Sequence, residues 1–287
     1  KHENHVAKII QAPNNDFILA TTTDLINDTP ELLVIRFDNN GKVIWERKFK
    51  EDNAIIHVVD ALMEPDGLTV LGKLNFLGEV YLAKLDHDGN KIWSKQTVDI
   101  NNRDSLPIEK IRSALLSGFK QTNDGNYIVY GSITEKIPGT DKLGWQGFIR
   151  KIDKEGNQIW QKTFGRTYAE WLNDLVLDND GSILVTGATE SPSTNLGDIY
   201  LVKFDSQGNK LWERNYFGKY FGNFGKAIAL TNDGGYIVFG DKTNTWHGVS
   251  KAVLIKVSKS GTKEWEKENN QFNKFAHIAN TNDGLVT

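Results

Sequence analysis

Cysteine is absent from this chain of 287 residues, and its absence excludes disulfides, thiol catalysis and cysteine-bound metal sites together. A cysteine-free chain of this length suits a bacterial protein that works outside the cytoplasm, in the periplasm, at the cell surface or after secretion. No apolar run approaches the roughly 20 residues that cross a bilayer, so we expect no transmembrane segment. The chain begins KHENHV, without an initiator methionine or a signal peptide, which indicates a processed or trimmed form.

A strong charge of either sign is also missing. The chain carries 34 Lys and Arg against 37 Asp and Glu, a net charge of -3, and no long run of one sign. Nucleic-acid-binding proteins show a basic patch or stripe, and polybasic segments bind anionic membranes, so we expect neither partner. Hydrophobic residues make up 39% of the chain, which is enough to bury a sizeable core.

Two short motifs recur in strict order along the chain. One motif is a turn such as DHDGNKIW from Asp86 or DSQGNKLW from Asp205, which comes second in each repeat. Its glycine precedes a tryptophan by four residues in the pairs Gly41 and Trp45, Gly89 and Trp93, Gly156 and Trp160, Gly208 and Trp212, and Gly261 and Trp265. The other motif is NDG or a relative, found six times, from NND ending at Asp16 to NDG starting at Asn282. A period of about 50 residues indicates a repeat architecture.

Short runs such as DIYLVKF (198–204) and GGYIVFG (234–240) lie between these motifs. Their length, their content of Ile, Val, Tyr and Phe and the flanking Asp, Asn and Gly predict strands, and helical periodicity is not sustained anywhere. Each repeat then forms a four-stranded antiparallel meander. The NDG turn joins its first two strands and the DxxG turn joins its last two. Because both faces of the third strand are apolar, each sheet needs a neighbour on either side, and radial stacking of such sheets is the β-propeller.

We therefore predict an all-β fold, a single β-propeller domain over residues 1–287. The repeats are expected at approximately residues 5–50, 54–98, 110–165, 170–218 and 224–270, with a partial repeat at 274–287. Since there are six NDG-type turns and five DxxG turns, six blades are slightly favoured and five blades are the alternative.

The turn residues have a structural interpretation. The turn Asp accepts a backbone hydrogen bond from two residues on, the glycine supplies a positive φ, and the tryptophan fills the gap between blades. A basic residue stands two positions before each turn: Arg36, Lys84, Lys151, Lys203 and Lys256. We favour pairing with a turn carboxylate or carbonyl, and the alternative is a ring of positive charge that holds an anion. The acidic turns lack the full ligand set of a calcium loop and the six histidines lack zinc spacing, so no metal is expected.

The repeats NDGGYIVFG with VLIKVSKSGTKEWEK, and DGSILVTG with DIYLVKFDSQGNKLWER, resemble a repeat of bacterial exported proteins. That repeat has the form DGGYIVxGxT followed by YLVKxDxxGNxxWxKxFG and is often found in lipoproteins and cell-surface proteins. The chain is also distantly similar to quinoprotein-like propellers. The resemblance covers nearly the whole chain, implies a propeller scaffold outside the cytoplasm and assigns no catalytic residue. The lack of a cysteine pair and the low repeat count argue against a quinone cofactor, and we expect no cofactor.

The long insertions fall between the second and third strands and between repeats, so antiparallel order places them at one end of every sheet. They carry the aromatic residues that break the repeat, with a histidine beside them: Trp145, Trp171, Trp246, Tyr168, Tyr216, Tyr220 and His247. Large rings on loops over a rigid scaffold suit recognition of a protein or of the apolar faces of sugars. The alternative is that the rings fold down to cover blade edges or plug the axial channel.

Two functions follow as hypotheses. The first is a non-catalytic, monomeric binding module outside the cytoplasm that recognises a protein or a glycan through its loop-bearing end; a lipid anchor in a segment outside this sequence stays open. The alternative is a glycan-active hydrolase or lyase that uses loop carboxylates such as Asp141, Glu170 and Asp198. The sequence has no GxSxG elbow, phosphate-binding glycine loop or dinucleotide fingerprint. Convergent carboxylates would favour the enzyme, and a broad aromatic surface would favour the binding module.

Overall fold

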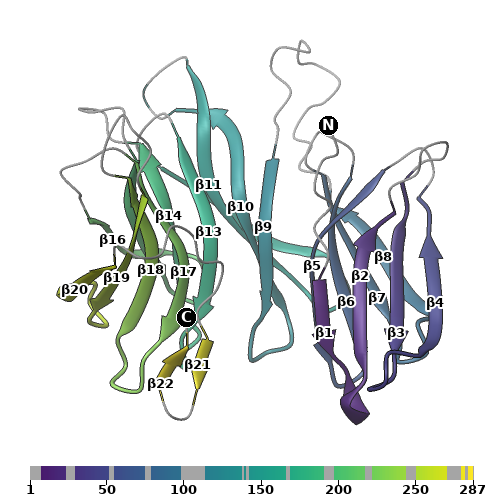
Figure 1. The fold of residues 1–287 in the computed structure, drawn as a ribbon. Coiled ribbons are helices and arrows are strands. Elements are labelled where there is room, and N and C mark those ends of the chain that lie inside the picture. The colour runs from purple at the N-terminus through teal and green to yellow at the C-terminus, as the bar shows by residue number, and fades with distance from the viewer. Residues whose placement is uncertain are drawn as a thin grey trace. The chain divides into compact units, whose positions relative to one another are not determined.

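The structure, a computed structural model, describes residues 8–23, 30–51, 55–74, 79–97, 114–137, 139, 142–165, 169–190, 197–216, 222–243, 250–269, 279–281 and 284–286. These residues form β-strands and one short 3-10 turn, η1 (Pro13–Asn15) (Figure 1). In this part of the chain no helix has the length and apolar character needed to cross a membrane.

Each repeat folds into one four-stranded antiparallel sheet, with its strands in chain order from edge to edge. The first two sheets contain β1 (Lys8–Gln11), β2 (Phe17–Thr22), β3 (Leu32–Phe37) and β4 (Val43–Phe49), then β5 (Ile56–Glu64), β6 (Gly67–Leu74), β7 (Glu79–Leu85) and β8 (Lys91–Thr97). The third contains β9 (Ala114–Gln121), β10 (Tyr127–Lys136), β11 (Leu143–Ile152) and β12 (Gln158–Phe164).

The fourth sheet contains β13 (Glu170–Leu177), β14 (Ile183–Glu190), β15 (Gly197–Phe204) and β16 (Lys210–Tyr216). The fifth contains β17 (Asn223–Leu230), β18 (Tyr236–Thr243), β19 (Ser250–Val257) and β20 (Lys263–Asn269). A two-stranded sheet of β21 (Ala279–Thr281) and β22 (Gly284–Val286) begins the next repeat. The predicted all-β architecture of five complete four-stranded repeats and the start of a sixth is confirmed.

The chain divides into two compact units. The first unit comprises Lys1–Phe119 and Lys151–Trp160, and the second comprises Lys120–Arg150 and Gln161–Thr287. The division passes through the third sheet, whose strands contribute to both units. The assignment of the whole chain to one domain stays a prediction.

The DxxG turn has the predicted geometry in all five repeats. Its glycines have φ between 78° and 86°, a region that side chains with a Cβ rarely enter. In the fourth repeat, Oδ1 of Asp205 accepts the backbone N–H groups of Gln207 and Asn209 at 3.0 and 2.8 Å. Ser258 replaces the aspartate in the fifth repeat, and its hydroxyl accepts the N–H of Thr262 at 3.1 Å. Hydrogen bonds within five consecutive residues therefore form this turn.

An ion pair connects the two turn motifs inside four of the five sheets. The basic residue near the end of the third strand reaches the carboxylate of the NDG-type turn that joins the first two strands. The pairs are Arg36 with Asp16 at 2.7 Å, Lys84 with Asp66 at 2.6 Å, Lys203 with Asp178 at 3.1 Å and Lys256 with Asp233 at 2.9 Å. The favoured interpretation, pairing with a turn carboxylate, is confirmed for these four residues.

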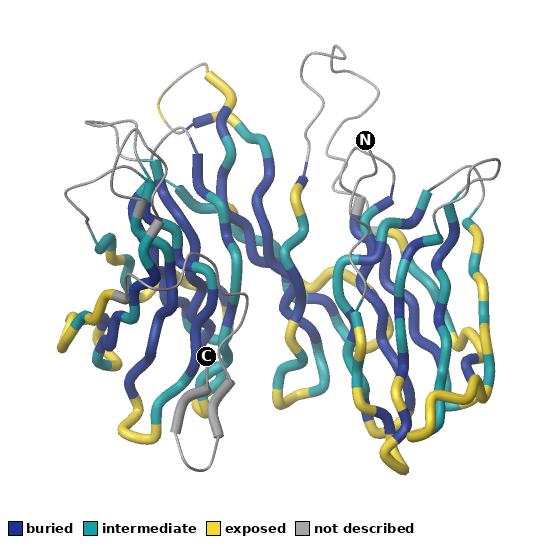
Figure 2. Tube along the Cα trace, viewed as in Figure 1, coloured by how far each residue is buried: buried dark blue, intermediate teal, exposed yellow. Residues whose placement is uncertain are grey.

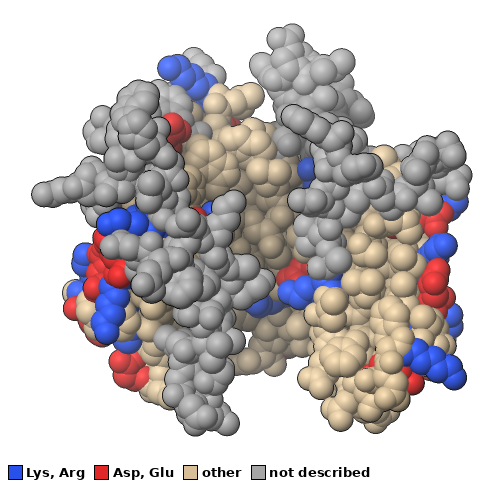
Figure 3. Space-filling model, in the orientation of Figure 1, with Lys and Arg blue, Asp and Glu red and all other residues tan. Residues whose placement is uncertain are grey.

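The inner strands of each sheet form the core, and the turns lie at the surface (Figure 2). Leu68, Val70 and Tyr81 of the second sheet are fully buried, and so are Tyr236 and Val238 of the fifth sheet. The fourth strands β4, β16 and β20 instead carry charges of both signs. Along β4 these charges line the exposed edge of the first sheet (Figure 3). Charged side chains on an edge strand oppose pairing with another chain.

Candidate functional site

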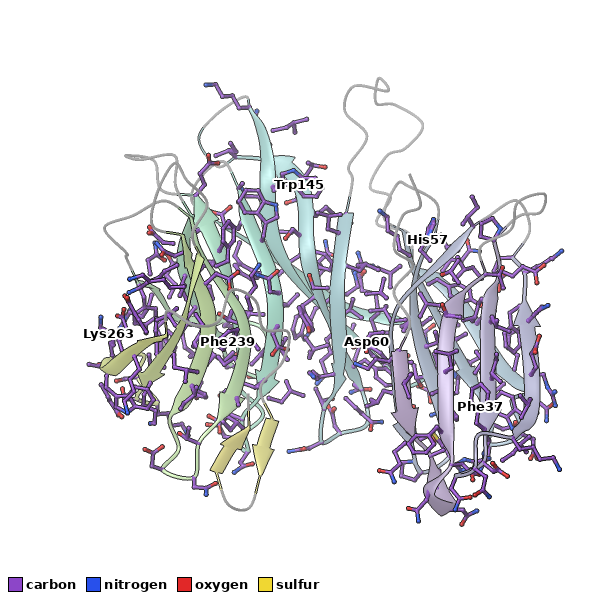
Figure 4. All side chains as sticks on the ribbon, in the orientation of Figure 1. Phe37, His57, Asp60, Trp145, Phe239 and Lys263 are labelled. Carbon is purple, nitrogen blue, oxygen red and sulfur yellow. The ribbon has the colours of Figure 1, made fainter. Side chains whose placement is uncertain are left out.

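Three of the seven predicted site residues lie in the described part of the chain. Trp145 was assigned to a loop, but it lies on β11, because the pairing of the third sheet extends to Leu143 (Figure 4). Trp171 was likewise expected on a loop, but it is the second residue of β13. Tyr216 was also assigned to a loop, but it is the last residue of β16. The residues outside the described ranges are Tyr168, Tyr220, Trp246 and His247.

Trp145 and Trp171 lie close together in space within the second unit. The backbone of Trp145 forms an isolated parallel bridge with Ala169, two residues before Trp171. This bridge joins the starts of β11 and β13, at the ends from which the long insertions leave. Both tryptophans are half-buried, so each residue keeps some accessible surface. The structure therefore brings two aromatic residues from neighbouring sheets to one loop-bearing end.

Tyr216 has a different role. Its hydroxyl donates to the carbonyl oxygen of Gly261 at 2.6 Å, and its ring packs on the core shared by the fourth and fifth sheets. Burial raises the pKa of Tyr216 to about 12. These contacts hold the turn of the fifth sheet against β16, so this side chain packs between sheets and is not displayed on a loop.

A row of buried polar side chains crosses the fourth sheet near the two tryptophans. Glu170 on β13 pairs in register with Thr189 on β14, and Thr189 pairs with Asp198 on β15. Residues in register on neighbouring strands project from the same face. Glu170 and Asp198, which the sequence placed on loops, are therefore strand residues on one face, and their Cα atoms lie about 10 Å apart by strand spacing. Asp141, the third proposed carboxylate, lies outside the described residues.

Glu170 is held by neutral hydrogen-bond donors. It has 0% exposure, and its two carboxylate oxygens accept the amide of Gln146 and the hydroxyl of Thr189, each at 3.2 Å. Gly165 lies against this group, because a Cβ there would overlap Gln146 and the Glu170 carboxylate. Sequence reasoning missed Gln146 and Thr189, since only the strand register places them beside Glu170.

Asp198 lies in a less polar environment. The residue is 5% exposed, and its Oδ2 finds no hydrogen-bond donor among the described residues. Burial raises the pKa of Asp198 to about 6, so the carboxyl group exchanges a proton near neutral pH. In the described ranges, no three Asp, Glu or His side chains gather in a way that could hold a metal ion.

No protein-family model and no curated protein sequence matches the chain. Among solved structures, the NanB sialidase from Streptococcus pneumoniae is similar with a TM-score of 0.58 and 8% identity, over 98% of this chain and 64% of that chain. The Synechocystis apocarotenoid oxygenase is similar with a TM-score of 0.54 and 11% identity, over 94% of this chain and 63% of that chain. This chain therefore spans a little under two thirds of the length of either protein. At such identities the likeness shows the fold alone, which is β-propeller-like.

Proposed function

We propose that the protein is a non-catalytic binding module that recognises a glycan or a protein surface through the loop-bearing end of its sheets. The observation that carries this proposal is the proximity of Trp145 and Trp171, half-buried on neighbouring sheets and linked by the bridge at Ala169. A ring supported by a strand loses little conformational freedom on binding, which is the property of aromatic hot-spot residues.

A second candidate, a glycan-active hydrolase or lyase, is favoured by the carboxylate pair. Glu170 and Asp198 lie on one face of the fourth sheet, and the raised pKa of Asp198 would suit a general acid. By their names, two similar structures are enzymes, a sialidase and an oxygenase, which fits this alternative as well as a binding scaffold. The complete burial of Glu170 and its bonds to Gln146 and Thr189 favour a structural role for that carboxylate, so we rank the binding module first.

The binding proposal is tested with Trp145→Ala and Trp171→Ala on a glycan array and in pull-downs from cell-surface extracts. Loss of a hot-spot ring should cost about 2 kcal/mol or more of binding free energy, a decrease in affinity of about 30-fold, while the urea midpoint falls only a little. Leu211→Ala is the matched control, because Leu211 is an exposed apolar residue of β16. Unchanged binding by both tryptophan variants would contradict the proposal.

The enzyme alternative has a separate measurement. Hydrolysis or elimination of a bound glycan that disappears in Asp198→Asn, with binding retained, would establish catalysis and overturn the non-catalytic assignment. Binding of a glycan by the wild-type protein without turnover would support the non-catalytic assignment.

The location of the protein is part of the same proposal. The absence of cysteine and the resemblance of the repeats to those of exported bacterial proteins support a place outside the cytoplasm. Membership of that specific repeat type, and action as a monomer, are likewise proposals.

A further inference from the structure

The same contact recurs between consecutive sheets in both units. The tryptophan of one fourth strand packs on the DxxG turn of the next sheet, so that a Cβ added to the turn glycine would lie 2.9 Å from the ring. The contact occurs between Trp45 and Gly89, Trp93 and Gly156, and Trp212 and Gly261. Each of these turn glycines is buried, although each lies at the tip of a hairpin.

The residue two positions after the tryptophan completes the contact. Arg47 lies 5.6 Å from the ring centroid of Trp45 and donates to the carbonyl oxygen of Asp88 at 3.1 Å. Lys95 covers Gly156 with its stem and donates to Asn157 in the same turn. Arg214 lies 5.7 Å from the ring centroid of Trp212, and its stem touches Gly261. An aromatic ring and a basic side chain therefore form a socket for the next turn.

The fifth sheet presents the same socket, and no turn among the described residues is seen to fill it. Lys267 lies 5.7 Å from the ring centroid of Trp265, the arrangement seen for Arg47 and Trp45. Trp265 is 39% exposed, whereas the four other tryptophans of the motif are more deeply buried. Gly41 in the first unit is a turn glycine without such a socket around it. Its turn is exposed, and no described atom lies within 4 Å of a Cβ added there.

We propose that Trp265 and Lys267 form a docking site for a β-hairpin whose turn reads Asp-x-x-Gly, presented by the last two strands of a sixth sheet. Three filled copies of this socket within the chain show what occupies it. The sheet of β21 and β22, which follows the fifth sheet and contacts β17, supplies the first two strands of that sixth sheet. The seated glycine would bury the exposed ring, and Lys267 would donate to the turn as Arg47 does.

The absence of cysteine from the chain allows a direct test with one introduced thiol. The thiol of Lys267→Cys reports how accessible the socket at Trp265 is. The matched control is Lys95→Cys, which places the thiol at the same position of the socket at Trp93, where the Gly156 turn is bound. In the chain of residues 1–287, a thiol reagent should modify Cys at position 267 at least about tenfold faster than Cys at position 95.

The occupant is then added by extending the chain after Thr287 with a copy of residues 239–269. Modification at position 267 should slow about tenfold, towards the rate at position 95. An extension in which valine replaces the copy of Gly261 should leave the rate high, because a Cβ does not fit under the ring. These two results together support the proposal.

Three results would overturn it. The first is fast modification at position 267 in an extended chain whose added strands are shown by circular dichroism and protease resistance to be folded. The second is protection in the unextended chain that rises with protein concentration and disappears in Gly41→Val, which would identify the Gly41 turn of a second copy as the occupant. The third is slow modification in the unextended chain at every concentration, which would show that the socket is already filled.

Discussion

Alanine at Gly89 should destabilise the protein far more than alanine at Gly41, although the two glycines occupy the same turn position. Their φ angles are 78° and 82°, so both substitutions incur the same backbone strain of about 1 kcal/mol. A Cβ at Gly41 meets no described atom within 4 Å. A Cβ at Gly89 would lie 2.9 Å from Trp45 Cζ3 and 3.0 Å from Arg47 Cγ, and such overpacking costs about 1 to 3 kcal/mol more.

We therefore expect Gly41→Ala to lower the free energy of unfolding by about 1 kcal/mol and Gly89→Ala by about 2 to 4 kcal/mol. Urea unfolding followed by far-ultraviolet circular dichroism measures both losses from the shift in midpoint. Replacing Trp45 by leucine should relieve the clash, so Gly89→Ala and Trp45→Leu together should be less harmful than the sum of the single changes by about 1 kcal/mol or more.

Gly41→Ala combined with Trp45→Leu is the control, because the added Cβ at Gly41 does not touch the ring. Its two effects should add within about 0.5 kcal/mol. Equal losses for Gly41→Ala and Gly89→Ala, or additive effects of Gly89→Ala and Trp45→Leu, would refute the packing of the tryptophan on the turn.

Three further measurements test the core and the polar row. Lys84→Met should lower stability by about 3 kcal/mol in urea unfolding, because the Glu64 carboxylate that Lys84 contacts is only 2% exposed and loses its cation; adding Glu64→Gln should recover part of the loss. Burial raises the pKa of Asp198 to about 6, above the value of about 3.9 in an unfolded chain, so its contribution to stability should fall as pH rises from about 4 to about 6. The wild-type protein should therefore lose up to about 3 kcal/mol relative to Asp198→Asn over this range, and an equal pH dependence of the two proteins would disprove the shift. Gly187→Ala should cost about 3 kcal/mol in the same assay, because its Cβ would overlap the carbonyl oxygen of Trp171; an unchanged midpoint would contradict the described pairing of β13 and β14.

Local features were predictable from the amino-acid sequence alone. The positive φ of the turn glycines and the aspartate caps follow from hydrogen bonds within a few consecutive residues. The four-stranded antiparallel repeat follows from strand-length apolar runs between turn motifs. The pairing of Lys203 with the Asp178 turn was predicted only in kind, because the sequence shows that the basic residue recurs and not which turn it reaches.

The candidate site depended on tertiary structure. Glu170, Thr189 and Asp198 share a face only because the pairing of β13 with β14 shifts by one residue between Leu172 and Asp174. A one-residue shift moves side chains to the opposite face, and no turn motif marks this bulge in the sequence. The contrast between buried Gly89 and exposed Gly41 likewise depends on whether another sheet is packed on the turn. Turn chemistry is local and can be read along the chain, whereas burial and register depend on residues from other strands and sheets.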